Sequence, residues 1–191
     1  MSTLFSNYQL DGFYDEIFTE TGEPRPHYRQ LFQRLAEMSV EEFDRHRRMA
    51  DAAFLNQGIT FTVYGDDQET ERIFPFDLLP RVIPHSEWSR LDAGLSQRIR
   101  ALNLFLADVY GDQKILRDGV ISRELVEGAA HFRKDFIGFA PPGGTYVHVA
   151  GIDLVRDAQG EYRVLEDNMR VPSGDSYVLE NRAVLERVFQ Q

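Results

Sequence analysis

Apolar residues recur every three or four positions in several segments of the chain, which is the spacing of one helix face. This pattern predicts helices over residues 27–38, 39–56, 86–110, 122–129 and 176–191. Ser39 followed by Glu42 is typical of a helix that begins with a capping box, and Gly58 is expected to end that helix. Ser86 is expected to cap the longest helix, which stops at Gly111.

Alternating β-branched and aromatic residues predict strands in two other regions of the chain. The predicted strands cover residues 59–65, 145–155 and 161–168, and an extended run interrupted by two prolines covers residues 71–83. The elements therefore follow the order helices, hairpin, long helix, hairpin, helix. This order predicts an α+β fold in which antiparallel β-hairpins pack with helices.

The last predicted strand turns polar where it ends. Residues 161–165 are mostly suited to a strand, but Glu166, Asp167 and Asn168 follow where more apolar residues are expected. Carboxylate and amide oxygens are the ligands of hard cations, which favours Mg²⁺ over zinc. A solvated hairpin edge with no ligand is the alternative interpretation of the same residues.

The pairing of the last two strands decides which side chains share a face. If the turn consists of the two residues 158–159, Asp153 and Glu166 are diagonal neighbours and lie on one face with Asn168. Gly151 would then lie opposite Glu166 and leave space for an ion. This register predicts a metal site formed by Asp153, Glu166 and Asn168.

The loop after the polar residues is a candidate phosphate site. Mg²⁺ in proteins is usually bound together with substrate phosphates. The segment "VPSG", residues 171–174, precedes a predicted helix, and helix N-termini bind anions. Ser173 and Gly174 are therefore expected to contact a nucleotide phosphate, and Arg170 adds a positive charge beside them.

Other conspicuous residues are expected to have structural roles. Ile152 and Leu165 lie opposite the polar face in the predicted register and are expected to be buried. Trp88 is expected to pack in the core. Asp77 and Arg81 could reach a nucleotide, but a structural ion pair between them is the preferred interpretation.

Composition and charge narrow the classes of partner. The chain has 191 residues, of which 42% are hydrophobic and 27% charged, and its net charge is -10. Such a charge disfavours a broad nucleic-acid or anionic-membrane surface. No apolar run approaches the ~18 residues of a membrane span. The absence of cysteine, together with an N-terminus unlike a signal peptide, favours a cytoplasmic location.

One long segment carries a family resemblance. The stretch "HVAGIDLVRDAQGEYRVLEDNMRVPSGDSYVLENR", residues 148–182, closely resembles the circularly permuted ATP-grasp proteins, a bacterial family related to glutathionylspermidine synthase. The resemblance extends back through "FPFDLLPRVIPHSEWSRLDAGLSQRIRALNLFLADVYGDQ", residues 74–113, and covers most of the chain from about Gly58.

The resemblance implies a cofactor and a reaction. In ATP-grasp enzymes an aspartate on one strand and Glu-x-Asn on the next bind the Mg²⁺ of ATP, and these roles fall on Asp153, Glu166 and Asn168. The implied reaction is ATP-dependent ligation, in which a carboxylate becomes an acyl phosphate and an amine then forms an amide. Nucleotide and a small-molecule acid and amine, or a peptide, are the implied substrates.

The resemblance also implies that part of the enzyme is missing. It divides the chain into an N-terminal arm with helices, residues 1–57, and a partial ATP-grasp domain, residues 58–191, that lacks the ATP-clamping half with its lysines. Asp175 stands where an apolar residue is expected. The fragment is therefore expected to be inactive alone. The alternative is a non-catalytic interaction module that completes its fold with a partner chain, or that self-associates through Val184, Leu185, Val188 and Phe189.

Overall fold

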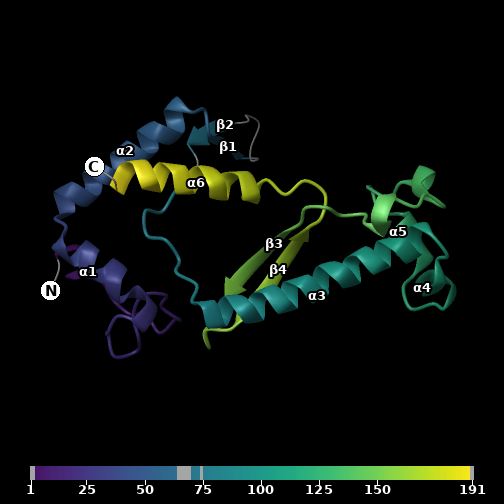
Figure 1. Ribbon diagram of the computed structural model, residues 1–191, viewed down its shortest axis with the longest axis horizontal. Helices are drawn as coiled ribbons and strands as arrows, with labels where there is room; N and C mark the ends of the chain where they lie inside the picture. Colours follow the sequence, from purple (N-terminus) through teal and green to yellow (C-terminus); the bar gives the residue numbers. More distant parts are fainter. Residues whose placement is uncertain (1–2, 64–69, 74, 190–191) are drawn as a thin grey trace. The chain divides into compact units, whose positions relative to one another are not determined.

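The computed structural model describes residues 3–63, 70–73 and 75–189. Its elements, in chain order, are α1 (Arg29–Glu37), α2 (Val40–Asn56), β1 (Thr60–Val63), β2 (Thr70–Ile73), α3 (His85–Tyr110), α4 (Lys114–Arg117), α5 (Arg123–Glu127), β3 (Gly151–Arg156), β4 (Tyr162–Asn168) and α6 (Gly174–Phe189) (Figure 1). The two hairpins β1–β2 and β3–β4 form separate two-stranded sheets. The predicted α+β fold with hairpins and helices is therefore confirmed.

The chain divides into two compact units. The first contains residues 1–84, 156–163 and 173–191, and the second contains residues 85–155 and 164–172. The second unit thus holds α3 and most of the β3–β4 hairpin, whereas the tip of that hairpin and α6 belong to the first unit. The boundary predicted near residue 58 stays a prediction.

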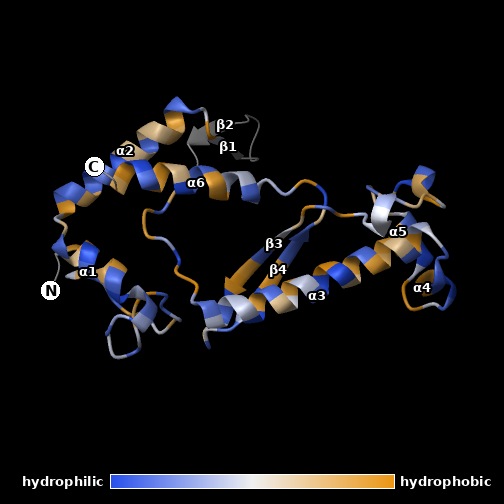
Figure 2. Ribbon diagram, viewed as in Figure 1, coloured by the Kyte–Doolittle hydropathy of each residue, from blue (hydrophilic) through white to orange (hydrophobic). Residues whose placement is uncertain are grey.

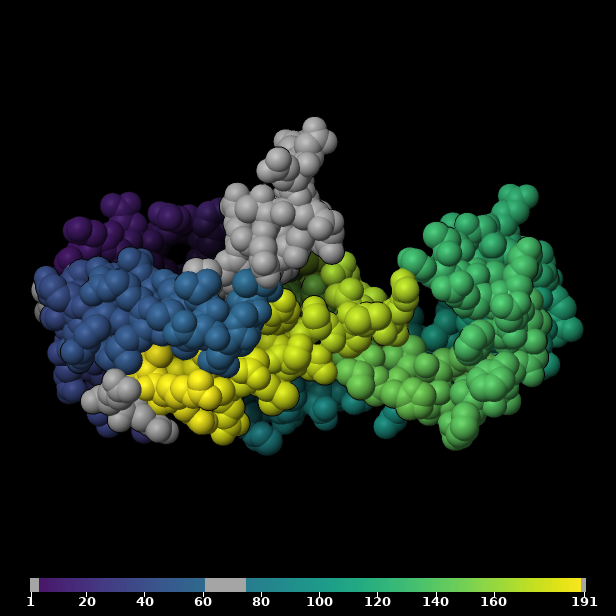
Figure 3. Space-filling view, turned by 90° about the horizontal axis from the view of Figure 1, so that it is seen from above, coloured from purple at the N-terminus to yellow at the C-terminus, as the bar shows by residue number. Residues whose placement is uncertain are grey.

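Helices α2 and α6 form the core of the first unit. Phe54 of α2 is fully buried and lies 5.0 Å, centroid to centroid, from the ring of Phe76. Apolar positions recur along both helices (Figure 2), and the two pack side by side in the space-filling view (Figure 3). Val184 and Val188 are 0% and 2% exposed there. The core of the unit already covers these two valines, so the expectation that they mediate self-association is wrong.

The N-terminal boundary of α2 follows from its sequence. Ser39 caps the helix, because its hydroxyl accepts a hydrogen bond from the Glu42 backbone N–H at 3.1 Å. Satisfying a free N–H at a helix start in this way contributes about 1 kcal/mol. The predicted cap is therefore confirmed. The predicted strand over residues 59–65 is present as β1, but its last two residues lie outside the described ones.

The tip of the β3–β4 hairpin is fixed to the N-terminal arm. The Arg156 guanidinium donates to Glu16 Oε1 at 3.0 Å and to the Gly160 carbonyl at 2.9 Å, and it stacks over Tyr14 and Tyr162. Its side chain is only 7% exposed. These contacts explain why the hairpin tip belongs to the first unit.

We expect Gly160→Ala to destabilise the chain by about 1–3 kcal/mol. Gly160 has φ +82°, and a Cβ placed on it would lie 2.5 Å from the ring of Tyr14. Gly58→Ala is the matched control: Gly58 also has a positive φ, +66°, but no atom within 4 Å of such a Cβ. Urea unfolding should show a larger loss for Gly160→Ala, and equal losses would contradict the steric part of this explanation.

In the second unit, helix α3 ends in an aromatic cluster. The ring of Tyr110 stacks on Phe132 at 5.4 Å and on Tyr146 at 5.8 Å, and the ring of Phe136 lies 6.0 Å away. At the other end of α3, Trp88 is 52% exposed, so the expectation that it packs in the core is wrong. No helix in the described part of the chain is long and apolar enough to cross a membrane.

Candidate functional site

The turn of the β3–β4 hairpin differs from the predicted one. The Gly160 N–H donates to the Asp157 carbonyl, and the Asp157 N–H donates to the Glu161 carbonyl, both at 2.9 Å. The loop therefore has three residues instead of two, with Gly160 in the left-handed region that such a turn requires. The predicted two-residue turn is wrong, and Asp157 lies opposite Glu161 instead of Gly160.

At the open end of the hairpin, Gly151 lies beside Asn168. A Cβ placed on Gly151 would be 3.6 Å from the Asn168 Cβ, so these two positions share a face of the sheet. Regular pairing from Asp157 and Glu161 would place Gly151 opposite Asp167, so the observed neighbour, Asn168, is offset by one residue. Strand β4 has seven residues against six in β3, and one extra residue is what a β-bulge supplies.

Space beside Gly151 is already occupied. The same Cβ would lie 2.9 Å from Cβ of Pro172, in the loop that follows β4. The expectation that Gly151 leaves room for an ion is therefore wrong. Its lack of a side chain allows the loop to approach the strand closely instead.

Side chains at the end of β4 point alternately to two faces. The Asn168 side-chain N–H donates to Glu166 Oε1 at 2.9 Å, so these two residues lie together. Asp167, between them, accepts two hydrogen bonds from Arg98 of α3 at 2.7 and 2.6 Å. Since strand residues alternate, Glu166 and Asn168 face away from Arg98.

Asp153 follows Gly151 by two residues on β3 and so shares its face, the face of Asn168 and Glu166. Within the described residues, its carboxylate has no hydrogen-bond or ion-pair partner. No group of three or more His, Cys, Asp or Glu in the described ranges could hold a metal. The candidate set has two carboxylates and one amide, so its third oxygen comes from Asn168.

The burial of Leu165, which was predicted to lie on the face opposite Glu166, differs from the prediction. Leu165 is 68% exposed, and Val164 beside it is 37% exposed. The expectation that Leu165 is buried is wrong, while Ile152 is partly buried. The hairpin is a two-stranded sheet, so neither of its faces is covered by a further strand.

The candidate phosphate contacts lie in two parts of the chain. In the second unit, Nη1 of Arg170 lies 3.4 Å from both ring nitrogens of His131. In the first unit, Ser173 precedes α6, and its carbonyl accepts hydrogen bonds from Ser176 Oγ at 2.7 Å and Tyr177 N–H at 3.3 Å. Gly174 is the first residue of α6.

Helix α3 also holds the segment that leads into β3. The Asn103 side-chain oxygen accepts hydrogen bonds from the backbone N–H groups of Tyr146 and Val147, at 2.9 and 3.0 Å. These N–H groups are therefore satisfied without a partner strand. This is a physical reason why β3 begins at Gly151, later than the predicted strand start at residue 145.

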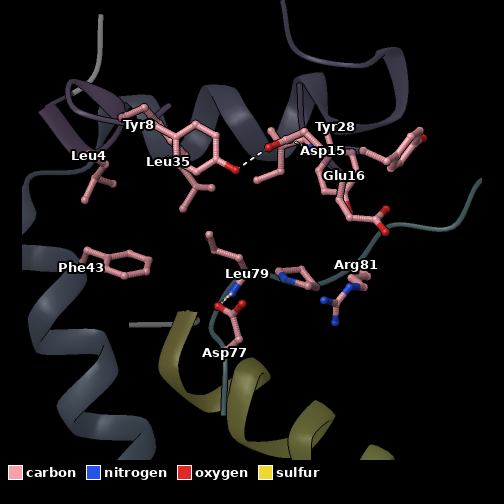
Figure 4. Close-up of a pocket in the computed structure, with 14 residues that line it drawn as sticks. Leu4, Tyr8, Asp15, Glu16, Tyr28, Leu35, Phe43, Asp77, Leu79 and Arg81 are labelled. Atoms are coloured by element: carbon pink, nitrogen blue, oxygen red, sulfur yellow. Dashed lines mark hydrogen bonds between the residues drawn. The ribbon is translucent and has the colours of Figure 1, made fainter. Parts of the chain in front are cut away.

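A separate cavity of about 470 Å³ lies in the first unit (Figure 4). Its carboxylates are mostly engaged by the chain itself: the Tyr8 hydroxyl donates to Asp15, which raises the pKa of Tyr8 to about 12. Asp77 Oδ1 accepts from the Leu79 N–H at 2.9 Å. Among the described residues Asp77 has no ion pair with Arg81, so the expected pair is wrong.

The sequence pattern of the family described as circularly permuted ATP-grasp type 2 matches residues 80–191. That span includes α3, the β3–β4 hairpin and α6. The chain therefore belongs to this family. The finer relation to glutathionylspermidine synthase stays a prediction.

Curated relatives are similar over nearly the whole chain. An uncharacterized protein of Synechocystis sp. is 50% identical over 96% of this chain and 38% of its own length. An uncharacterized protein of Mycobacterium leprae is 48% identical over 97% of the chain and 33% of its own length. A Frankia alni protein with the name "Putative glutamate--cysteine ligase 2-3" is 40% identical over 98% of the chain and 21% of its own length. The chain thus spans between about a fifth and two fifths of the length of these relatives.

Sequence reasoning missed the residues that surround the candidate site. Arg98 lies 69 positions from Asp167, and nothing in the local pattern of α3 separates it from the other arginines of that helix. Nothing in the sequence around His131 marks it as a neighbour of Arg170. Asn103 had one usable signal, because an amide amid the apolar positions of a helix often bonds to backbone.

Proposed function

We propose that the chain is the metal-binding portion of an ATP-grasp carboxylate–amine ligase. The observation that carries the proposal is the arrangement at the open end of the β3–β4 hairpin, where Asp153, Glu166 and Asn168 share one face and Asp167 is held on the other. Membership of the ATP-grasp family supports it. So does the similarity to a protein that carries a glutamate–cysteine ligase name.

The three side chains fit a hard divalent cation. All three offer oxygen, the donor that Mg²⁺ prefers, and two of them are anionic. Because the Asn168 amide N–H bonds one oxygen of Glu166, the other Glu166 oxygen and the Asn168 oxygen remain as donors. A bound Mg²⁺ would neutralise charge on the phosphates of ATP.

The chain's own contribution is to hold donors in place before the nucleotide arrives. Glu166 and Asn168 restrain each other through their hydrogen bond, and Asp153 is kept free of internal partners in the described part of the chain. Arg170, oriented against His131, supplies positive charge two residues beyond Asn168. Ser173 and Gly174 at the start of α6 are proposed to contact the nucleotide phosphates.

A second candidate is an interaction module that completes its fold with a partner chain. Several large apolar side chains are unusually exposed, and such surfaces mark interaction sites. They include Leu104, Leu165, Val171, Val178 and Leu179, each 65–77% exposed. This alternative predicts association with another polypeptide and no dependence on Glu166. For the ligase we propose nucleotide and small-molecule or peptide partners inside the cell, with no nucleic-acid or membrane surface.

We expect Glu166→Ala to weaken Mn²⁺ binding by more than about 10-fold, since it removes one of two charged donors. The measurement is a Mn²⁺ titration of the 191-residue chain followed by electron paramagnetic resonance, with and without a non-hydrolysable ATP analogue. Glu124→Ala, an exposed carboxylate on α5, is the control for loss of charge. Equal Mn²⁺ affinity in the two variants, or no binding by the unaltered chain, would exclude the metal site.

A further inference from the structure

Within the second unit, helix α3 contacts strand β4 and the segment that precedes strand β3. Arg98 makes a two-point ion pair with Asp167 of β4, with N–O distances of 2.7 and 2.6 Å. Five residues later on the same helix, Asn103 binds the backbone of the segment that leads into β3. A two-point arginine–carboxylate pair fixes orientation as well as distance.

This ion pair involves the residue that lies between two of the proposed metal ligands. Asp167 is the residue between Glu166 and Asn168, so its direction sets theirs. With Asp167 held towards Arg98, the other two side chains are directed to the opposite face, where their own hydrogen bond forms. Any rotation of β4 at Asp167 would turn both donors away from Asp153.

Stability alone does not account for the pair. The side chains of Arg98 and Asp167 are 44% and 19% exposed, and ion pairs with this exposure contribute little to folding.

We propose that Arg98 is a positioning residue for the metal site, which orients Glu166 and Asn168 through its ion pair with Asp167. The inference rests on the proposed function, because it needs a metal at that face. Residues outside the ligand shell that orient ligands typically change metal affinity by about 10- to 100-fold when they are replaced.

Electrostatics alone predicts a change in metal affinity opposite to the one that a positioning role predicts, so the two explanations can be distinguished. Arg98 carries a positive charge near a cation site, so its removal would strengthen metal binding if only the field mattered. If Arg98 positions the ligands, its removal weakens binding instead. The direction of the change therefore distinguishes positioning from a field effect.

The test is Mn²⁺ titration of Arg98→Ala, Arg98→Lys and the control Arg100→Ala in the 191-residue chain. Arg100 lies on the same helix and is exposed, without an ion pair among the described residues. We expect the Kd for Mn²⁺ to rise about 10-fold in Arg98→Ala. It should rise less in Arg98→Lys, which keeps the charge but loses the two-point contact. Arg100→Ala should not weaken binding, and melting temperatures without metal should be unchanged.

The outcomes separate the inference from the function on which it rests. If the unaltered chain binds Mn²⁺ through Glu166 but Arg98→Ala binds equally well or more tightly, the positioning role is overturned and the metal site stands. If the unaltered chain binds no Mn²⁺, the function itself fails and the inference with it. If both Arg98 variants lose their fold without metal, the pair is a stability element and the inference is overturned.

Discussion

Phe54→Ala is expected to lower the free energy of unfolding by about 3–5 kcal/mol. The side chain is fully buried in the first unit, in a cluster with Ala50, Leu78, Val184 and Val188. Removing the ring leaves a cavity between α2 and α6 that these small aliphatic neighbours cannot fill. Chemical denaturation followed by circular dichroism would measure the loss.

Phe13→Ala is the matched control for this prediction. It deletes the same atoms, but Phe13 is 79% exposed in the N-terminal arm. Surface substitutions of this kind usually change stability by about 0.5 kcal/mol or less. Comparable losses in the two variants would mean that α2 and α6 do not form the core of the unit.

The helices could be predicted because their signals are local. Ser39 and Glu42 mark the start of α2, and an apolar stripe marks α3 and α6. The burial of an individual side chain could not be predicted in the same way, because it depends on segments distant in the sequence. Trp88 and Leu165 were both expected inside and are 52% and 68% exposed, because a pattern identifies an apolar face without identifying what covers it.

The register of the β3–β4 hairpin could not be predicted from the sequence, because it depends on the length of the turn. The sequence "DAQG" permits a two-residue turn or a three-residue turn with glycine in the left-handed position. The structure has the second, which alone would move Asp153 to the face opposite Glu166. At the open end Gly151 lies beside Asn168, and alternation from these two residues returns Asp153 and Glu166 to one face. This offset cannot be found by counting residues from the turn.

For the candidate site, the predictable part was the pairing of Glu166 with Asn168, because alternation along one strand requires no knowledge of the fold. The face of Asp153 could be predicted only with the correct strand register. The contact of Arg98 with Asp167 could be predicted only from the position of α3 beside β4. The sequence therefore predicts the donors of the proposed site but not the contact of Arg98 with Asp167, because the fold brings these two residues together from segments 69 positions apart.

The 191-residue chain alone is expected to show no ATP-dependent ligation. Phosphoryl transfer depends on positioning and on charge stabilisation around the phosphates, and losing the positioning of reactants costs on the order of 10⁵-fold or more in rate. The chain contains two lysines, Lys114 and Lys134, and the first already pairs with Asp112 at 3.0 Å. The net charge of -10 also opposes the binding of a triphosphate.

The measurement is Mg²⁺-dependent ADP release over a panel of carboxylic acids and amines. The full-length Synechocystis relative is the comparison, since this chain corresponds to only 38% of it, and the same relative cut to the matching segment tests whether length is the cause. We expect both short chains to stay at the background set by Glu166→Ala. Turnover by the 191-residue chain that disappears in Glu166→Ala would instead mean that one hairpin face and the start of α6 suffice for catalysis, and that the longer relatives use their remaining length for another purpose.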